Sequence, residues 1–187
     1  MKRNVERARA SSRWGALAVL SGVATFAVAQ GCVEGLTAAP TVDCPPFEDF
    51  KKVSPLLEQR CGTLDCHGNT ARPLRLYGQY GLRFNPDDED EDLYTGNLGS
   101  PTTAEEVERN YFAVCGLEPE KMEAVTSGQQ PPDSLTLVRK PRLTEKHKGG
   151  RIWNEGKVED RCVVGWIQAD YEEGAMPPED CADALAD

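Results

Sequence analysis

The sequence predicts an all-α fold in which short helices are joined by long loops. Apolar residues recur at helical spacing in several short segments, and the 17 glycines and 13 prolines mark the breaks between them. Only 7% of the residues are aromatic, and no repeat with a period of about 20 to 50 residues is present. A chain of this composition gains much stability from covalent cross-links and from a large apolar cofactor.

The first helical segment leads to a cysteine. Apolar residues recur at helical spacing from Phe47 to Val53, and Ser54 followed by Pro55 is typical of a helix cap and first turn. We therefore expect a short second helix to begin here and to end at Cys61.

The clearest helix begins at a capping box. Thr103 and Glu106 have the spacing at which each side chain bonds to the backbone N–H of the other residue. One apolar face then runs from Val107 to Cys115, and Gly116 is a typical end.

Two further helices are expected, from Pro119 to Val125 and from Val158 to Asp170. The segment 133–141 between them is short, apolar and ended by proline, so its periodicity does not distinguish a strand from a helix.

One motif carries recognisable chemistry. Cys61 and Cys66 are followed at once by His67, and two cysteines before a histidine form the attachment pattern of a c-type haem. Each thiol would bond a vinyl group of the porphyrin, and the imidazole would be the proximal iron ligand.

The spacing in this motif leaves alternatives open. Four residues separate the cysteines where the usual pattern has two, although Gly62 allows the longer loop to bulge. A local disulfide between Cys61 and Cys66, or a zinc site that recruits two more ligands, would also explain the residues. For a second axial ligand of iron, the candidates are His147, Met176 and Met122.

The first 31 residues are typical of a secretory signal peptide. A basic start precedes an apolar run over 15–29, which is too short for a comfortable membrane span. Cleavage could occur before Gln30, or before Cys32 with lipidation of that cysteine. Lipidation at Cys32 and haem attachment would use three of the seven cysteines. The other four could form two disulfides in any of three alternative pairings, and they are Cys44, Cys115, Cys162 and Cys181.

The remaining chain reads as a tether over 32–46, a domain over 47–177 and an acidic tail over 178–187. The formal net charge is −10, which disfavours nucleic-acid binding and favours a basic redox partner. Six consecutive acids over 87–92 are expected to form an exposed loop. Three arginines are candidates for pairing with haem propionates: Arg72, Arg75 and Arg83.

Several segments together resemble bacterial single-haem cytochrome c domains, in particular those borne on exported lipoproteins of the planctomycete-type cytochrome c group. The resemblance covers most of 47–175 but not 82–117, and it rests on Phe50–Cys61, Cys66-His67-Gly68, Asp133–Leu135, His147–Gly150, Gly165-Trp166-Ile167 and Gly174-Ala175. It implies a cytochrome c-like fold, with short helices around one haem.

The resemblance also bears on the distal ligand. In that family the ligand is often a methionine in a Met-Pro-Pro loop before the final helix, whereas here His147 occupies that place and Met176 follows the helix. The resemblance thus implies His147 as distal ligand, with Met176 as the alternative. A histidine there should lower the reduction potential relative to methionine.

We therefore expect a haem c protein that carries electrons at the cell envelope, lipid-anchored in the periplasm or at the outer membrane. It is expected to be a carrier and not an enzyme, since the sequence has no Gly-x-Ser-x-Gly elbow and no phosphate-binding glycine loop. The alternative is a cofactor-free, disulfide-stapled surface lipoprotein with a binding or structural role.

Overall fold

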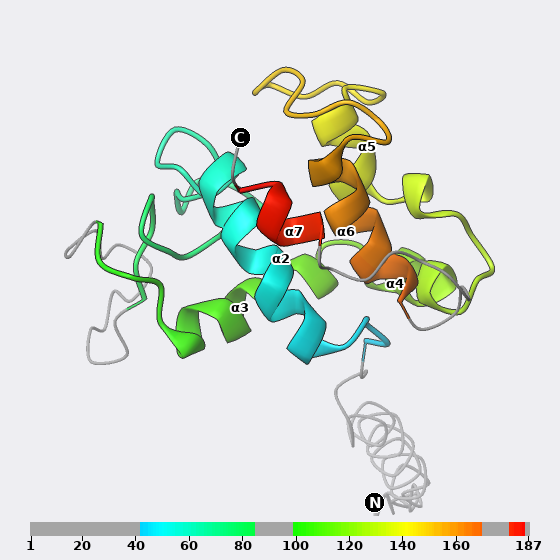
Figure 1. The fold of residues 1–187 in the computed structure, drawn as a ribbon, viewed down its shortest axis with the longest axis horizontal. Coiled ribbons are helices and arrows are strands. Elements are labelled where there is room, and N and C mark those ends of the chain that lie inside the picture. The colour runs from blue at the N-terminus through cyan, green and yellow to red at the C-terminus, as the bar shows by residue number, and fades with distance from the viewer. Residues whose placement is uncertain (1–41, 85–98, 170–179, 186–187) are drawn as a thin grey trace, which may run out of the picture. The chain divides into compact units, whose positions relative to one another are not determined.

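The computed structural model describes residues 42–84, 99–169 and 180–185. Within these ranges the chain is helical and contains no strand, which confirms the all-α class (Figure 1). The helices are α2 (Phe47–Arg60), α3 (Ala104–Cys115), α4 (Pro119–Thr126), η2 (Pro132–Ser134, a 3-10 turn), α5 (Thr136–Arg142), α6 (Val158–Gln168) and α7 (Asp180–Asp183). The expected signal peptide, Cys32, the acidic run over 87–92 and Met176 lie outside the described residues.

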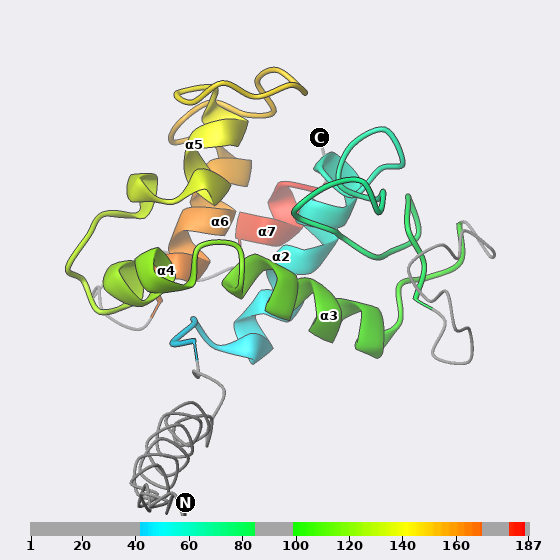
Figure 2. The ribbon, with the colours of Figure 1, turned by 180° about the vertical axis from the view of Figure 1, so that it is seen from behind.

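Helix α2 is the element on which α3, α6 and α7 pack (Figure 2). Its inward face is fully buried and consists of Phe50, Val53, Leu56 and Leu57. The rings of Phe50 and Trp166 lie 5.0 Å apart between centroids, which joins α2 to α6. This packing fixes the end of α2, where the cysteine motif begins.

The expected break at Ser54 and Pro55 is wrong, because α2 continues through both residues. The Ser54 hydroxyl donates to the Glu58 carboxylate one turn later at 2.7 Å instead of capping a new helix. Pro55 removes one backbone N–H from the helix, and the burial of α2 compensates for that loss.

Helix α3 begins as the sequence predicts. Thr103 accepts from the Glu106 N–H at 3.2 Å, while the Glu106 carboxylate accepts from the Thr103 N–H at 2.9 Å. The helix ends before Gly116, also as expected. Helices α4 and α6 agree with their predicted ranges to within two residues at either end.

The undecided segment 133–141 forms η2 followed by α5. Leu137, Val138 and Pro141 are buried, which is the spacing of one helical face. Helix α5 leads into the loop 143–157, which carries the second histidine of the protein.

Two disulfides use the four cysteines expected to pair: Cys44–Cys115 and Cys162–Cys181. The first anchors the end of the expected tether to α3. The second anchors α7 to α6, so the expected tail contains a short helix with Cys181 and Ala184 buried. In the described part of the chain, no helix is both long and apolar enough to cross a bilayer.

Candidate functional site

The turn after α2 brings the two ends of the cysteine motif together. The His67 N–H donates to the Cys61 carbonyl at 2.8 Å. The Thr63 carbonyl accepts from the N–H groups of Cys66 and Gly68, at 2.9 and 3.0 Å. The four residues between the cysteines are therefore folded into a hydrogen-bonded turn, which accommodates the longer spacing.

Three glycines allow this turn to pack backbone against backbone. A Cβ atom placed on Gly68 or on Gly81 would lie 2.1 Å from the Gly62 carbonyl oxygen, closer than atoms can approach. Any side chain at Gly68 or Gly81 would therefore displace the turn from the chain that follows it. The neighbouring His67 would be displaced together with the turn.

The ring of His67 is held by the backbone that follows the motif. Its Nδ1–H donates to the Leu74 carbonyl at 3.0 Å, which leaves Nε2 as the unprotonated nitrogen with a free lone pair. Burial lowers the pKa of His67, although the Leu74 carbonyl opposes this shift. A neutral imidazole with its other nitrogen bonded to a carbonyl is the usual form of a metal ligand.

His147 lies opposite, on the loop after α5, and is held in the same way. Its Nδ1–H donates to the Gly150 carbonyl at 2.9 Å, so Nε2 is the ring nitrogen that remains to bind a ligand. A Cβ atom on Gly149 would lie 3.3 Å from the His147 ring, so glycine there lets the loop fold closely over the imidazole. The two imidazoles are 6.3 Å apart between centroids and nearly parallel, at 13°.

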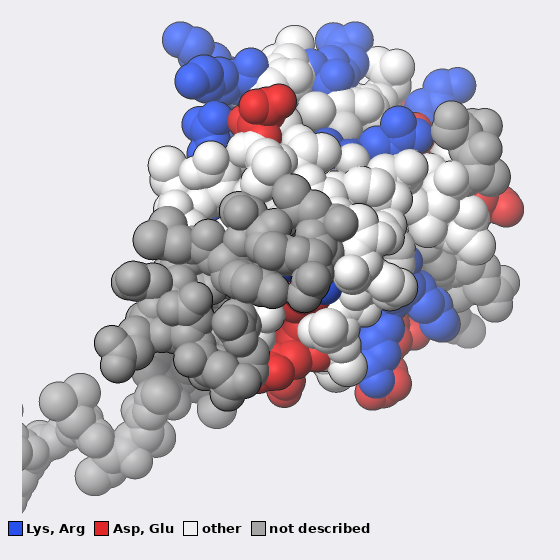
Figure 3. Space-filling view, turned by 90° about the vertical axis from the view of Figure 1, so that its left-hand side faces the viewer, with Lys and Arg blue, Asp and Glu red and all other residues white. Residues whose placement is uncertain are grey.

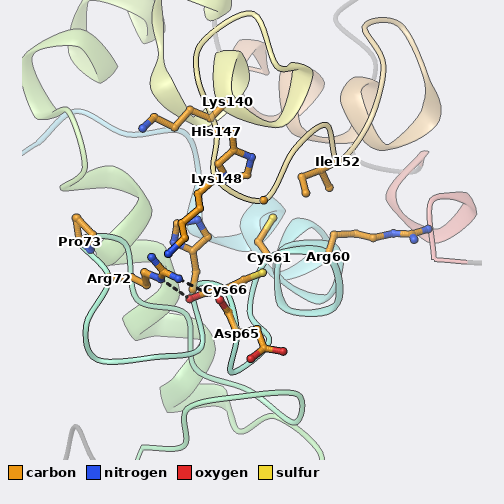
Figure 4. A pocket seen from close by; sticks show the side chains of 12 residues that line it. Arg60, Cys61, Asp65, Cys66, Arg72, Pro73, Lys140, His147, Lys148 and Ile152 are labelled. Atoms are coloured by element: carbon orange, nitrogen blue, oxygen red, sulfur yellow. Dashed lines mark hydrogen bonds between the residues drawn. The ribbon is translucent and has the colours of Figure 1, made fainter.

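Two adjoining cavities surround the histidine pair, and Cys61, His67 and His147 line both of them. The larger has a volume of about 330 Å³, with a polar rim that includes Arg60, Asp65, Arg72, Lys140 and Lys148 (Figure 4). The smaller, of about 130 Å³, has apolar walls formed by Leu57, Leu74, Leu76, Leu117, Leu137 and Trp153. The site is thus apolar on one side and cationic on the other.

The cysteines of the motif both have free thiols in this structure. Cys61 is buried at the end of α2, and burial raises its pKa to about 12. Cys66 is partly exposed on the larger cavity. Cys61 therefore remains protonated at neutral pH and is protected from the oxidation that thiolates undergo.

The structure brings together Cys61, Cys66, His67 and His147, which come from α2, the following turn and the loop after α5. Met122 instead lies in the hydrophobic core on α4 and lines neither cavity.

The three candidate arginines separate. Arg72 lines the larger cavity and donates through Nε to the Cys66 carbonyl at 3.2 Å. Arg83 forms a buried ion pair with Glu106, and Arg75 lines a different, open cavity beside α3. The expectation that all three could serve a cofactor is therefore wrong for Arg83, whose guanidinium is committed elsewhere.

Sequence reasoning did not identify Trp153 or Lys140 as parts of the site. The buried indole Nε1–H of Trp153 has no hydrogen-bond partner among the described residues, which leaves a donor available in the wall of the apolar cavity. No spacing or motif marks either residue, because both reach the site only through the fold of α5 and its loop.

One turn before Cys61, the buried carboxyl of Glu58 gives a pH-dependent prediction. Burial raises its pKa above 4.5, although hydrogen bonds from Thr102 and Ser54 oppose the shift. Folding therefore favours the protonated form, and this stability is lost as pH rises through the folded-state pKa. We expect Glu58→Gln to raise the melting temperature near neutral pH and to leave it nearly unchanged below pH 4.5.

Thermal unfolding followed by circular dichroism across this pH range tests the Glu58 prediction. Glu48→Gln is the control, because Glu48 is exposed on the same helix and should show no such pH-dependent gain. Equal effects of the two substitutions would contradict a burial effect at Glu58.

Comparison of the chain with protein-family models, curated proteins and solved structures finds no match. Across 42–84, 99–169 and 180–185, no three or more His, Cys, Asp or Glu side chains gather in a way that could hold a metal ion. The geometry of the cysteines, the two histidines and the cavities is therefore what indicates a function.

Proposed function

We propose that the chain is a single-haem c-type cytochrome that carries electrons at the cell envelope. Cys61 and Cys66 would hold the porphyrin through thioether bonds, and His67 and His147 would be the proximal and distal iron ligands. The cytochrome c-like fold and the lipid anchor at Cys32 belong to the same proposal.

The observation that carries the proposal is the spacing of the two imidazoles. An imidazole centre lies roughly 1.2 Å from its nitrogens, and bonds from imidazole nitrogen to a transition metal are about 2.0 Å long. Two rings on opposite sides of one ion therefore have centres about 6.4 Å apart, and those of His67 and His147 are 6.3 Å apart. The Nδ1 atom of each ring is bonded to a backbone carbonyl, which leaves the Nε2 atom of each ring for the iron.

The walls of the site also fit a porphyrin, which has an apolar body and two carboxylates. The leucines and Trp153 offer an apolar wall for the macrocycle. Arg72 and Lys148 line the polar cavity on the side away from Arg60, where cations could neutralise carboxylates (Figure 4). The unpartnered Trp153 Nε1–H is a further donor in this wall.

When bound, haem supplies a ferric–ferrous couple. The residues of the chain would fix its position, since the turn 61–68 holds the thiols and His67 together while Gly150 orients His147 from the other side. With His67 and His147 both as ligands, the iron would suit electron transfer and would have no position left for a substrate.

The two disulfides support an exported location. Such bonds persist in oxidising compartments such as the periplasm, and cytosolic reductants usually keep thiols reduced. The pairs Cys44–Cys115 and Cys162–Cys181 account for four cysteines and leave Cys61 and Cys66 available for the cofactor.

The test is the absorption spectrum and intact mass of the mature protein, produced in bacteria that have a cytochrome c maturation system. We expect a sharp α band that resists extraction with acidified acetone, and a mass increased by one haem. Cys61→Ala together with Cys66→Ala should abolish covalent attachment. A colourless protein in which Cys61 and Cys66 form a third disulfide or remain as titratable thiols would instead support the cofactor-free, stapled lipoprotein.

A further inference from the structure

The loop that carries His147 also carries several exposed, positively charged side chains. Lys146, Lys148 and Arg151 are exposed, and none has an ion-pair partner among the described residues. We call these three residues the basic loop surface. Lys146 and Lys148 flank His147 directly, and Arg151 lies between Gly150 and the cavity residue Ile152.

The surroundings of this surface add to its positive charge. The larger cavity beneath it is lined by four basic side chains and by one acidic side chain, Asp65. Lys140 contributes less, because it pairs with Glu145 at 3.4 Å. Lysine and arginine side chains gather along the upper edge of Figure 3, at the end of the molecule formed by α5 and its loop.

Local charge and net charge point to different partners. The net charge of −10 favours a basic partner, but much of the negative charge lies outside the described ranges, including the six acids at 87–92. At physiological ionic strength, charges are screened beyond about 8 Å. A docked partner therefore responds mainly to the charges it touches, and beside His147 these are positive.

We propose that the basic loop surface is the docking site for an acidic redox protein. This inference rests on the proposed function, because a partner that exchanges electrons must approach the edge of the site, and His147 lies at that edge. Lysines on both sides of the distal ligand would orient an acidic partner over it. The sign of the partner's surface is thus set by this loop and not by the net charge.

A carboxylate-terminated monolayer on gold is a defined acidic probe for this surface. Adsorption of the complete mature protein is measured with a quartz crystal microbalance, and electron exchange with the gold is measured by voltammetry on the same film. The variant Lys146→Glu with Arg151→Glu reverses two charges at residues that do not line either cavity. The matched control is Lys51→Glu with Lys52→Glu, which changes the net charge equally at two exposed residues of α2.

We expect the loop variant to adsorb about tenfold more weakly to the carboxylate monolayer, with a corresponding loss of electron exchange, and the α2 control to change less than about twofold. Equal losses in both variants, or no loss in the loop variant, would overturn the proposal. Equally charge-dependent binding of the loop surface to anionic phosphatidylglycerol vesicles would also overturn it, by marking a lipid-facing surface. Adsorption does not require haem. If the protein carried no haem but the loop variant still adsorbed more weakly, the proposed function would be refuted, and the basic loop surface would still be shown to bind acidic surfaces.

Discussion

In the proposed haem protein, His147→Ala is expected to convert a six-coordinate, low-spin iron into a predominantly high-spin one. The reason is geometric: His147 faces His67 at the separation of two ligands on one ion, and alanine has no atom that could replace its nitrogen. Absorption and electron paramagnetic resonance spectra of the ferric protein, produced with cytochrome c maturation, measure the change.

Two further variants make this test specific. Lys146→Ala alters the neighbouring residue on the same exposed loop and should leave the low-spin spectrum unchanged. His147→Met should retain a low-spin iron while raising the reduction potential, because thioether ligation favours the ferrous state. Added imidazole should restore the low-spin spectrum of His147→Ala.

The alternative ligand gives the opposite pattern. If Met176 binds iron, His147→Ala keeps its low-spin spectrum and Met176→Ala loses it. That outcome would contradict the ligand assignment and would leave the proposed covalent attachment at Cys61 and Cys66 unaffected.

Features set by residues close in sequence were predictable. The capping box of Thr103 and Glu106 formed as expected, because its two hydrogen bonds span only three residues. The assignment failed at Ser54 and Pro55, where a local signal for a new helix was overridden by burial of the whole of α2. The sequence alone could not distinguish a helix from a strand over 133–141, because the buried face of α5 is defined only by the residues that pack against it.

In the site, too, local features were predictable and contacts between distant segments were not. The turn 61–68 and its histidine can be read from the sequence, since they are contiguous. The approach of His147 to within 6.3 Å of His67, by contrast, depends on where α5 leaves the loop 143–157. The choice among three disulfide pairings and the role of Trp153 in the cavity wall likewise depend on contacts between segments far apart in the chain.

The largest stability loss is expected for Glu106→Gln. The Glu106 carboxylate is fully buried and accepts two hydrogen bonds from Arg83, at 2.7 and 3.0 Å. It also accepts from the N–H groups of Phe84 and Thr103, at 3.0 and 2.9 Å. An amide of the same shape would remove the negative charge that the buried guanidinium of Arg83 contacts through both carboxylate oxygens.

We expect Glu106→Gln to lower the free energy of unfolding by about 3 to 5 kcal/mol, the usual effect of breaking a buried pair from one side. Urea unfolding followed by circular dichroism measures it. Glu48→Gln, which breaks an exposed pair with Lys51 on α2, is the control and should cost less than about 1 kcal/mol.

The double variant Arg83→Met with Glu106→Gln separates the pair from its surroundings. It should lose less stability than the sum of the two single changes, because it removes the buried charge together with its partner. Additive losses would mean that Arg83 acts chiefly through the Ser100 and Pro101 carbonyls, to which it donates at 2.8 and 3.2 Å. In either case the Arg83 guanidinium connects the segment before residue 85 to the segment after residue 98. This connection links the N-terminal end of α3 to the chain that follows the cysteine motif.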